Sequence, residues 1–141
     1  MGKILAAFIA VLAVIASCDI KTDEKRIFAD SDKDVTVYVG SASSTATMKV
    51  ISYGDYPNGY DDRRVLGSSV HGCDEEYVSD LIDDLGAKEV FFEDLGDVLC
   101  VYYYSPRIRS FKTINGKKVN LQTAKRNEKY SVGCPMIFGG Y

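Results

Sequence analysis

The one histidine of the chain lies two residues before a cysteine, in His71-Gly72-Cys73. An imidazole beside a thiol can activate a nucleophile, but the two side chains must converge and a third group must orient the base. Nothing else in the sequence supports such a pair, and the chain contains no Gly-x-Ser-x-Gly, Walker or HExxH motif. We therefore expect a protein that is not an enzyme. Turnover that depends on His71 and Cys73 would contradict this expectation.

Carboxylates are abundant, but their spacing does not predict a metal or catalytic site. Asp30, Asp32 and Asp34 alternate like the opening of a calcium loop, yet the glycine and the closing glutamate of such a loop are absent. The other carboxylates occupy positions typical of solvated helices and turns. With one histidine there is no His-rich metal site. The sequence predicts neither a metal nor another cofactor.

The N-terminus has the pattern of an export signal. Lys3 is followed by residues 4–16, which carry no polar side chain. As a helix this run would be roughly 20 Å long, which is short for the ~30 Å hydrocarbon core of a bilayer and typical of the apolar core of a secretion signal. A buried helix is a weaker explanation, because a stretch that is apolar on every side would need burial all round.

The residues after this run, Ile15-Ala16-Ser17-Cys18, resemble the lipobox of bacterial lipoproteins. The resemblance implies that the Cys18 thiol receives a diacylglyceryl group, that residues 1–17 are removed as a signal peptide, and that the mature chain begins at Cys18. A multiply acylated anchor holds a protein stably on a membrane, whereas one acyl chain alone binds only marginally. Asp19 resembles the second-position signal that retains enterobacterial lipoproteins in the inner membrane. The expected location is therefore the periplasmic side of the cell membrane, with the inner membrane favoured over the outer membrane.

The remaining chain is expected to have two parts. Residues 18–33 are polar and charged with little periodicity, which predicts a lipidated flexible tether. Residues 34–141 are expected to form a single domain, with no internal repeats.

The predicted fold class of this domain is α+β, with a mainly antiparallel sheet of five to seven strands and one principal helix at about 74–85. Asp74 is the expected N-cap, Gly86 follows the helix end, and apolar residues recur at helical spacing between them. Asn115-Gly116 predicts a hairpin turn, and the apolar tail 135–141 is expected to pack across the sheet. The predicted strands are 35–39, 47–53, 65–70, 89–92, 98–104, 117–123 and 130–134.

Three further cysteines lie in this domain, and export would place them in an oxidising compartment. One disulfide and one leftover thiol are then expected. Cys73–Cys134 is favoured, because Cys100 lies in an apolar strand where a buried thiol is stable. Cys73–Cys100 is the alternative pairing.

The formal net charge of −3 hides a strong polarisation. Residues 18–105 carry 8 Lys/Arg and 19 Asp/Glu, or −11, whereas residues 106–141 carry 8 Lys/Arg and 1 acid, or +7. The basic end could pair with the acidic part of the domain, contact anionic lipid or bind an acidic partner. Nucleic acid is not expected for an exported protein. The basic patch comprises Arg107, Arg109, Lys112, Lys117, Lys118, Lys125, Arg126 and Lys129.

Two groups of residues form the predicted partner surface. The helix 74–85 should expose its acidic side, where a basic partner can dock. The Gly- and Tyr-rich loop at 53–60 offers rigid amphipathic contact area. The residues concerned are Asp80, Asp83, Asp84, Tyr53, Tyr56 and Tyr60.

A second, weaker resemblance covers 73–104. The helix pattern Val78-x-x-Leu81-Ile82-x-x-Leu85-Gly86, followed later by the strand Val101-Tyr102-Tyr103-Tyr104, resembles SmpA/OmlA-type lipoproteins, which assist β-barrel assembly in the outer membrane. The strand lacks the tryptophan of that family, and no Gly-Met-Thr precedes the helix. Core spacing alone also explains these residues.

The sequence thus predicts a membrane-anchored periplasmic lipoprotein that acts as a non-enzymatic binding or accessory factor at the cell envelope, with an envelope protein as its partner. Two alternatives stay open. One is a phage- or prophage-encoded lipoprotein that blocks superinfection. The other is an inhibitor of a secreted hydrolase such as lysozyme.

Overall fold

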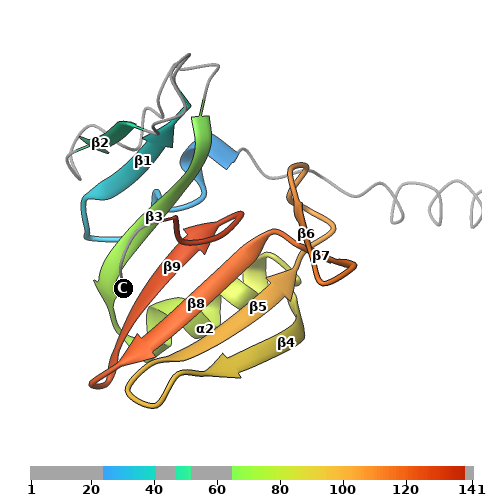
Figure 1. Ribbon diagram of the computed structural model, residues 1–141. Coiled ribbons are helices and arrows are strands. Elements are labelled where there is room, and N and C mark those ends of the chain that lie inside the picture. Colours follow the sequence, from blue (N-terminus) through green and yellow to red (C-terminus); the bar gives the residue numbers. More distant parts are fainter. Residues whose placement is uncertain (1–23, 41–46, 52–64, 139–141) are drawn as a thin grey trace, which may run out of the picture.

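The computed structural model describes residues 24–40, 47–51 and 65–138. Within them lie a seven-stranded sheet, a separate two-stranded sheet and one α-helix, which confirms the predicted α+β class (Figure 1). The elements are η1 (Glu24–Arg26), β1 (Val35–Val39), β2 (Thr47–Ile51), β3 (Val65–Cys73), α2 (Glu75–Asp84), β4 (Lys88–Asp94), β5 (Leu99–Tyr104), β6 (Lys112–Ile114), β7 (Lys117–Val119), β8 (Leu121–Arg126) and β9 (Lys129–Cys134).

The main sheet has the order β2-β1-β3-β9-β8-β5-β4, and each neighbouring pair is antiparallel. Its central pairing joins β3 to the last strand, with Val70 opposite Val132. The edges are β2 and β4. The C-terminal strand β9 therefore lies in the middle of the sheet, between β3 on one side and β8 on the other.

Each face of this sheet has its own core. Helix α2 lies behind the sheet in Figure 1 and packs on the face that carries Val70, Leu121 and Val132. The opposite face carries a smaller cluster around Cys100 and Tyr102. Successive side chains of a strand point to opposite faces of the sheet. Because side chains pack on both faces of β5, the sequence of this strand is apolar without alternation.

Helix α2 forms where its local signals predict. The Asp74 carboxylate accepts a hydrogen bond from the Tyr77 N–H at 2.9 Å, and Gly86 follows the last turn with φ of +57°. Val78 is buried against the sheet. The observed bounds lie within one residue of the predicted 74–85.

The predicted flexible tether at 18–33 is wrong from Glu24 onward, and so is a domain that begins at 34. Phe28 is completely buried and Ile27 is 7% exposed, and both belong to the core under α2. Charged residues flank this pair in the sequence, so the segment resembles a solvated tether. Burial of two large apolar side chains in the core is nevertheless enough to hold a short segment in place. The folded domain therefore includes residues from Glu24.

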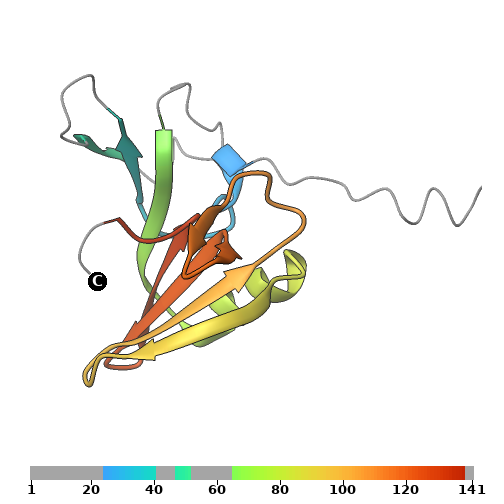
Figure 2. The ribbon, with the colours of Figure 1, turned by 45° about the vertical axis from the view of Figure 1, so that its right-hand side comes forward.

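The predicted single strand at 117–123 is also wrong, because it is divided at Asn120 into β7 and β8. The Asn120 side chain is fully buried, its Oδ1 accepts from the Ser105 N–H at 2.7 Å, and its Nδ2 donates to the Ser105 carbonyl at 2.7 Å. These bonds fix the bend at which the chain leaves the β6–β7 hairpin and enters the main sheet. The hairpin stands outside the plane of that sheet, at one end of β5 and β8 (Figures 1 and 2).

The β6–β7 turn is the one expected from Asn115-Gly116, whose φ values of 51° and 76° suit a tight hairpin. The tail also packs across the sheet as expected, for the part 135–138 that the structure describes. The Ile137 N–H donates to Gln122 Oε1 at 2.9 Å, and the Ile137 side chain is buried in the cluster around Cys100.

Candidate functional site

Helix α2 carries an acidic ridge. Its exposed carboxylates include the predicted Asp80, Asp83 and Asp84, and in the described part of the chain none of the salt bridges involves them. The last turn holds no basic residue of its own, but the Arg107 guanidinium donates a hydrogen bond to the Asp84 carbonyl oxygen. That contact places positive charge at the negative end of the helix dipole. The acidic ridge comprises Glu75, Glu76, Asp80, Asp83 and Asp84.

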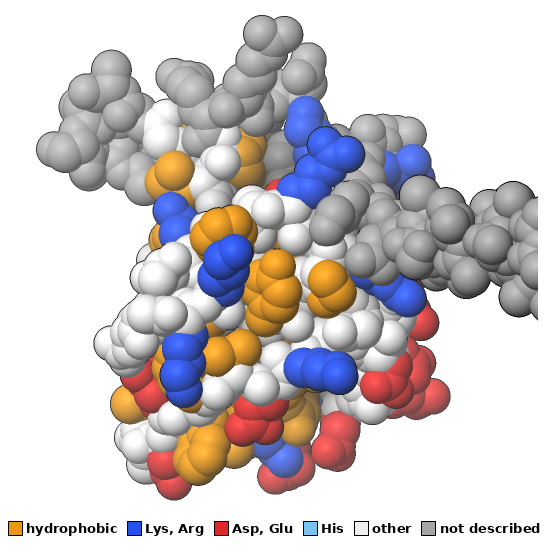
Figure 3. Space-filling model, turned by 90° about the vertical axis from the view of Figure 1, so that its right-hand side faces the viewer, with side chains coloured by type: hydrophobic (Ala, Val, Ile, Leu, Met, Phe, Trp, Pro, Cys, Tyr) orange, Lys and Arg blue, Asp and Glu red, His pale blue; other side chains and the backbone are white. Residues whose placement is uncertain are grey.

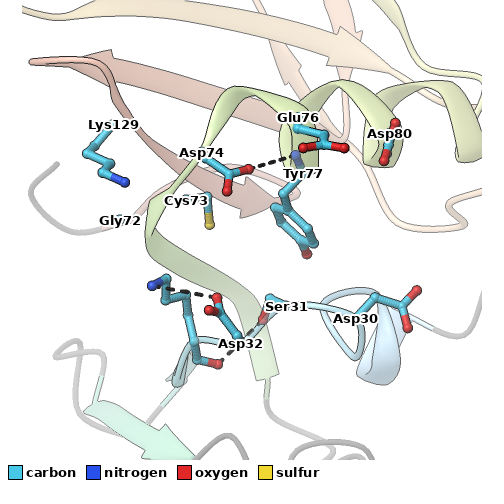
Figure 4. A pocket seen from close by; sticks show the side chains of 11 residues that line it. Asp30, Ser31, Asp32, Gly72, Cys73, Asp74, Glu76, Tyr77, Asp80 and Lys129 are labelled. Atoms are coloured by element: carbon cyan, nitrogen blue, oxygen red, sulfur yellow. Dashed lines mark hydrogen bonds and ion pairs between the residues drawn. The ribbon is translucent and has the colours of Figure 1, made fainter.

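An acidic pocket of about 320 Å³ lies on one flank of the ridge (Figure 4). It is formed by the first turns of α2, the end of β3 and the loop after η1, and Figure 4 shows Asp30, Ser31 and Asp32 on one side of it and Asp74, Tyr77 and Asp80 on the other. The Lys33 ammonium lies 3.5 Å from Asp32, so one of its two lysines is already paired. The lining residues are Asp30, Ser31, Asp32, Lys33, Gly72, Cys73, Asp74, Glu76, Tyr77, Asp80 and Lys129.

Two titratable groups lie at the inner end of the acidic pocket. Burial raises the pKa of the Cys73 thiol to about 11, so this thiol stays protonated at neutral pH and is a poor nucleophile. Burial also raises the pKa of the Tyr77 phenol, and an interaction with the Ser31 side chain partly offsets this rise. In the described residues no group of three His, Cys, Asp or Glu side chains is placed to hold a metal ion.

The His71 ring does not pair with Cys73. Its Nδ1 lies 2.8 Å from the Ser131 hydroxyl and its Nε2 lies 3.1 Å from the Ser69 hydroxyl, so both nitrogens already have partners. A β-bulge with Gly72 at φ of +73° separates the histidine from the cysteine. Burial lowers the pKa of His71. The two serines were not singled out from the sequence, because Ser131 is brought to the ring only by the long-range pairing of β3 with β9.

An apolar groove of about 210 Å³ lies on the other flank of α2, between the helix and strands β5, β8 and β9. Leu99 at its edge is 39% exposed, and Phe92 of the edge strand β4 is 61% exposed beside Val101. Leu95, in the β4–β5 turn, is 53% exposed. The groove residues are Glu75, Val78, Ser79, Ile82, Leu99, Val101, Tyr103, Thr123, Lys125 and Tyr130.

The sequence analysis missed this groove. The signal available was the pair Phe91-Phe92, since only one of two successive strand residues can face a given side. Phe91 stacks on Tyr102 at 4.4 Å between ring centroids, and Phe92 points to the other face. Which face the helix leaves uncovered depends on the tertiary fold.

The predicted basic patch divides into two groups. In the first group, Lys125 pairs with Glu128 at 3.5 Å, Arg126 pairs with Asp97 at 3.2 Å, Arg107 binds the end of α2, and Lys129 lines the acidic pocket.

The second group surrounds the β6–β7 hairpin, and in the described residues none of its members lies in a salt bridge. Lys118 instead lies 4.6 Å from the ring centroid of the 45% exposed Phe111. Internal contacts therefore account for three of the eight predicted residues, Lys125, Arg126 and Arg107. We call Arg109, Lys112, Lys117 and Lys118, together with Phe111, the basic hairpin.

The expected disulfide is not formed, since Cys73, Cys100 and Cys134 are all buried free thiols. Strand register explains why the favoured pairing Cys73–Cys134 is wrong. Cys73 lies opposite Tyr130, four residues before Cys134 on β9, so the two cysteines are roughly 13 Å apart along the strands. A disulfide needs Cα atoms within about 7 Å.

The alternative pairing fails for the same reason. Cys73 is opposite Tyr130, Tyr130 is opposite Lys125, and Lys125 is opposite Leu99. Cys100 is therefore three strand spacings from Cys73, or roughly 14 Å. Sequence spacing could not show this, because the order of the strands decides it.

Several predicted residues lie outside the described part of the chain. These are Cys18, Asp19, Tyr53, Tyr56 and Tyr60. Across 24–40, 47–51 and 65–138, no helix has the length and apolar character that crossing a membrane requires.

No family model, no curated protein and no solved structure matches this chain. The resemblance of 73–104 to SmpA/OmlA-type lipoproteins stays a prediction. The residues that carry it include Val78, Leu85 and Tyr102, which are buried in the two cores. Packing alone accounts for their spacing.

Proposed function

We propose that this protein is a lipoprotein anchored through Cys18 on the periplasmic side of the cell membrane, and that its domain binds an envelope protein without catalysing a reaction. Asp19 favours the inner membrane. The observation that carries the binding function is the acidic ridge of α2, whose carboxylates form no salt bridge with another described residue, beside the apolar groove. An exposed apolar groove rimmed by charged side chains is typical of a site that a partner protein covers.

The groove and the ridge together define the chemistry of the partner. Exposed Phe92, Leu95 and Leu99 offer apolar area of the kind that gives binding energy at the centre of an interface. The carboxylates of the ridge add steering and orientation, which charges at a rim supply. The partner should therefore present apolar side chains flanked by Lys or Arg.

The state of the reactive groups supports a non-enzymatic role. The only imidazole is held between Ser69 and Ser131, and the nearest thiol has a pKa near 11. Neither group is prepared for nucleophilic chemistry at neutral pH.

The anchor is tested on the full chain in a bacterial host. Cys18→Ser should abolish incorporation of labelled palmitate and release the protein from the membrane fraction. Ser17→Ala, which keeps a small residue before the cysteine, is the matched control and should be lipidated normally. Labelling that persists in Cys18→Ser would refute the anchor.

The binding surface is tested by placing a photoreactive side chain at Leu99 in the anchored protein. The matched control places it at Leu66, which is 40% exposed on β3. A discrete crosslinked protein from Leu99 and none from Leu66 is the expected result. It should disappear when Asp80 and Asp83 are changed to Asn. Equal crosslinking from both positions would argue against a groove-specific partner.

A second candidate is an inhibitor of a basic secreted hydrolase, such as lysozyme. The acidic ridge favours it, because such an enzyme would meet five carboxylates on one helix. Stoichiometric inhibition of lysozyme by the chain from residue 19, lost in the Asp80→Asn, Asp83→Asn variant, would support this candidate. Full lysozyme activity at excess protein would exclude it for that enzyme.

A further inference from the structure

We propose that the basic hairpin is a membrane-contact surface that docks on anionic lipid headgroups. The inference deepens the proposed function, since it rests in part on an anchor at Cys18, and it assigns an orientation to the anchored domain. The hairpin would lie on the bilayer, whereas the acidic ridge and the apolar groove would stay available to a protein partner.

The chain between the proposed anchor and the fold is short. Six steps of the chain join Cys18 to Glu24, where the described structure begins. Even fully extended, they span roughly 20 Å. A domain held on so short a connection must keep the surface around Glu24 near the headgroups.

Glu24 lies beside the basic hairpin. Its Oε1 accepts a hydrogen bond from the Ser110 N–H, and its Oε2 accepts one from the Ser110 hydroxyl, each at 2.7 Å. Ser110 lies between Arg109 and Phe111. The point at which the chain enters the fold is thus fixed directly to the segment that carries the positive charge.

The composition of this surface suits contact with anionic lipid. Residues 98–127 contain no Asp or Glu, and in the described residues Arg109, Lys112, Lys117 and Lys118 form no salt bridge. Figure 3, which views the hairpin side, shows Lys and Arg interleaved with hydrophobic side chains, while Asp and Glu gather along the lower and right margins. Anionic lipid attracts such clusters of bases.

The basic hairpin also exposes an aromatic ring. Phe111 is 45% exposed at the base of the hairpin, with the Lys118 ammonium 4.6 Å from its ring centroid. An amphipathic surface that places an aromatic ring among Lys and Arg side chains matches the boundary between headgroups and acyl chains. A soluble acidic protein would need the charges but not this ring.

The experiment uses the chain from residue 19, which lacks Cys18 and therefore tests the surface without the anchor. It should fold, because all residues of both cores lie within 27–137. The chain should bind vesicles of phosphatidylcholine mixed with phosphatidylglycerol, bind pure phosphatidylcholine vesicles far less, and dissociate as salt is raised.

Neutralising two hairpin charges should weaken this binding selectively. Lys117→Gln with Lys118→Gln should lower the partition onto phosphatidylglycerol vesicles roughly 30-fold. The matched control is Arg126→Gln with Lys129→Gln, which removes the same charge at the β8–β9 turn, at the far end of β8. The control should bind nearly as the parent does. Equal losses of vesicle binding in both variants would mean that binding depends on net charge alone, which would overturn the proposal.

Insertion of the ring is tested with tryptophan, which the chain lacks. The Phe111→Trp variant should shift its emission to shorter wavelength on phosphatidylglycerol vesicles, and the Phe92→Trp control on β4 should not. Lysine-dependent binding without this shift would assign the hairpin to a soluble polyanion, such as an acidic protein, and would overturn the membrane assignment. Failure of Cys18 labelling with vesicle binding intact would refute the anchor alone, so the two proposals fail separately.

Discussion

The carboxylate of Glu24 receives both hydrogen bonds that Ser110 can donate, across a sequence separation of 86 residues. This relationship joins the start of the fold to the segment before β6. It also places Glu24, which the sequence composition assigned to a tether, within the folded domain.

Glu24→Ala should lower the free energy of unfolding by about 1 kcal/mol, because it removes two charge-assisted hydrogen bonds at an exposed site. Urea denaturation of the chain from residue 19 measures this loss, and hydrogen exchange should show faster exchange of the Ser110 amide. The control is Glu128→Ala, whose carboxylate lies 3.5 Å from the ammonium of Lys125 on the surface. It should change stability by less than about 0.5 kcal/mol. Equal effects would show that the Glu24 bonds add nothing beyond an ordinary surface contact.

The elements that the sequence predicts well are those with local signals. Helix α2 is delimited by its capping residue Asp74 and by Gly86, and the β6–β7 turn is determined by Asn115-Gly116. Each of these depends on residues within a few positions of one another. Such signals can be recognised in the sequence without any knowledge of the tertiary fold.

The elements that could not be predicted depend on long-range pairing. The pairing of β9 with β3 brings Ser131 to His71 and separates Cys73 from Cys134. No local pattern encodes that pairing. For the candidate site, the acidic side of the helix was predictable from the charges, whereas the groove depends on how much of β4 and β5 the helix leaves uncovered.

Gly133→Ala should destabilise the protein by about 2–3 kcal/mol, the upper part of the range for overpacking a well-filled site. A Cβ atom there would lie 2.5 Å from the Ile137 backbone nitrogen, so the tail would have to leave the sheet. Urea denaturation measures the loss, and limited proteolysis should show earlier cleavage after 134. The control is Gly86→Ala, where a Cβ meets no atom within 4 Å but φ is +57°. It should cost about 1 kcal/mol without exposing the tail. An unaltered tail in Gly133→Ala would contradict the close packing.

His71 should make stability fall as the pH is lowered. Burial lowers its pKa in the folded state below the value of 6.5, so the unfolded chain binds the proton more tightly. The contribution of this group is complete above that value and is lost as the pH falls toward the folded pKa. Urea midpoints between about pH 7.5 and 5.5, above the range in which most carboxylates titrate, should therefore decline. His71→Gln should flatten that decline. A decline of the same size in the variant would assign it to other groups.

The three thiols of the chain from residue 19 should be reduced and inaccessible in the native protein. Burial raises the pKa of Cys73 to about 11 and raises that of Cys134 further, so little thiolate is present at pH 8. Ellman's reagent should detect almost no thiol in the folded chain and all of Cys73, Cys100 and Cys134 after denaturation without reductant. Preparing the protein by periplasmic export makes the test stringent, because an oxidising compartment forms a disulfide wherever two cysteines can meet. A single reactive thiol after denaturation would mean that two cysteines had paired, which the strand register forbids.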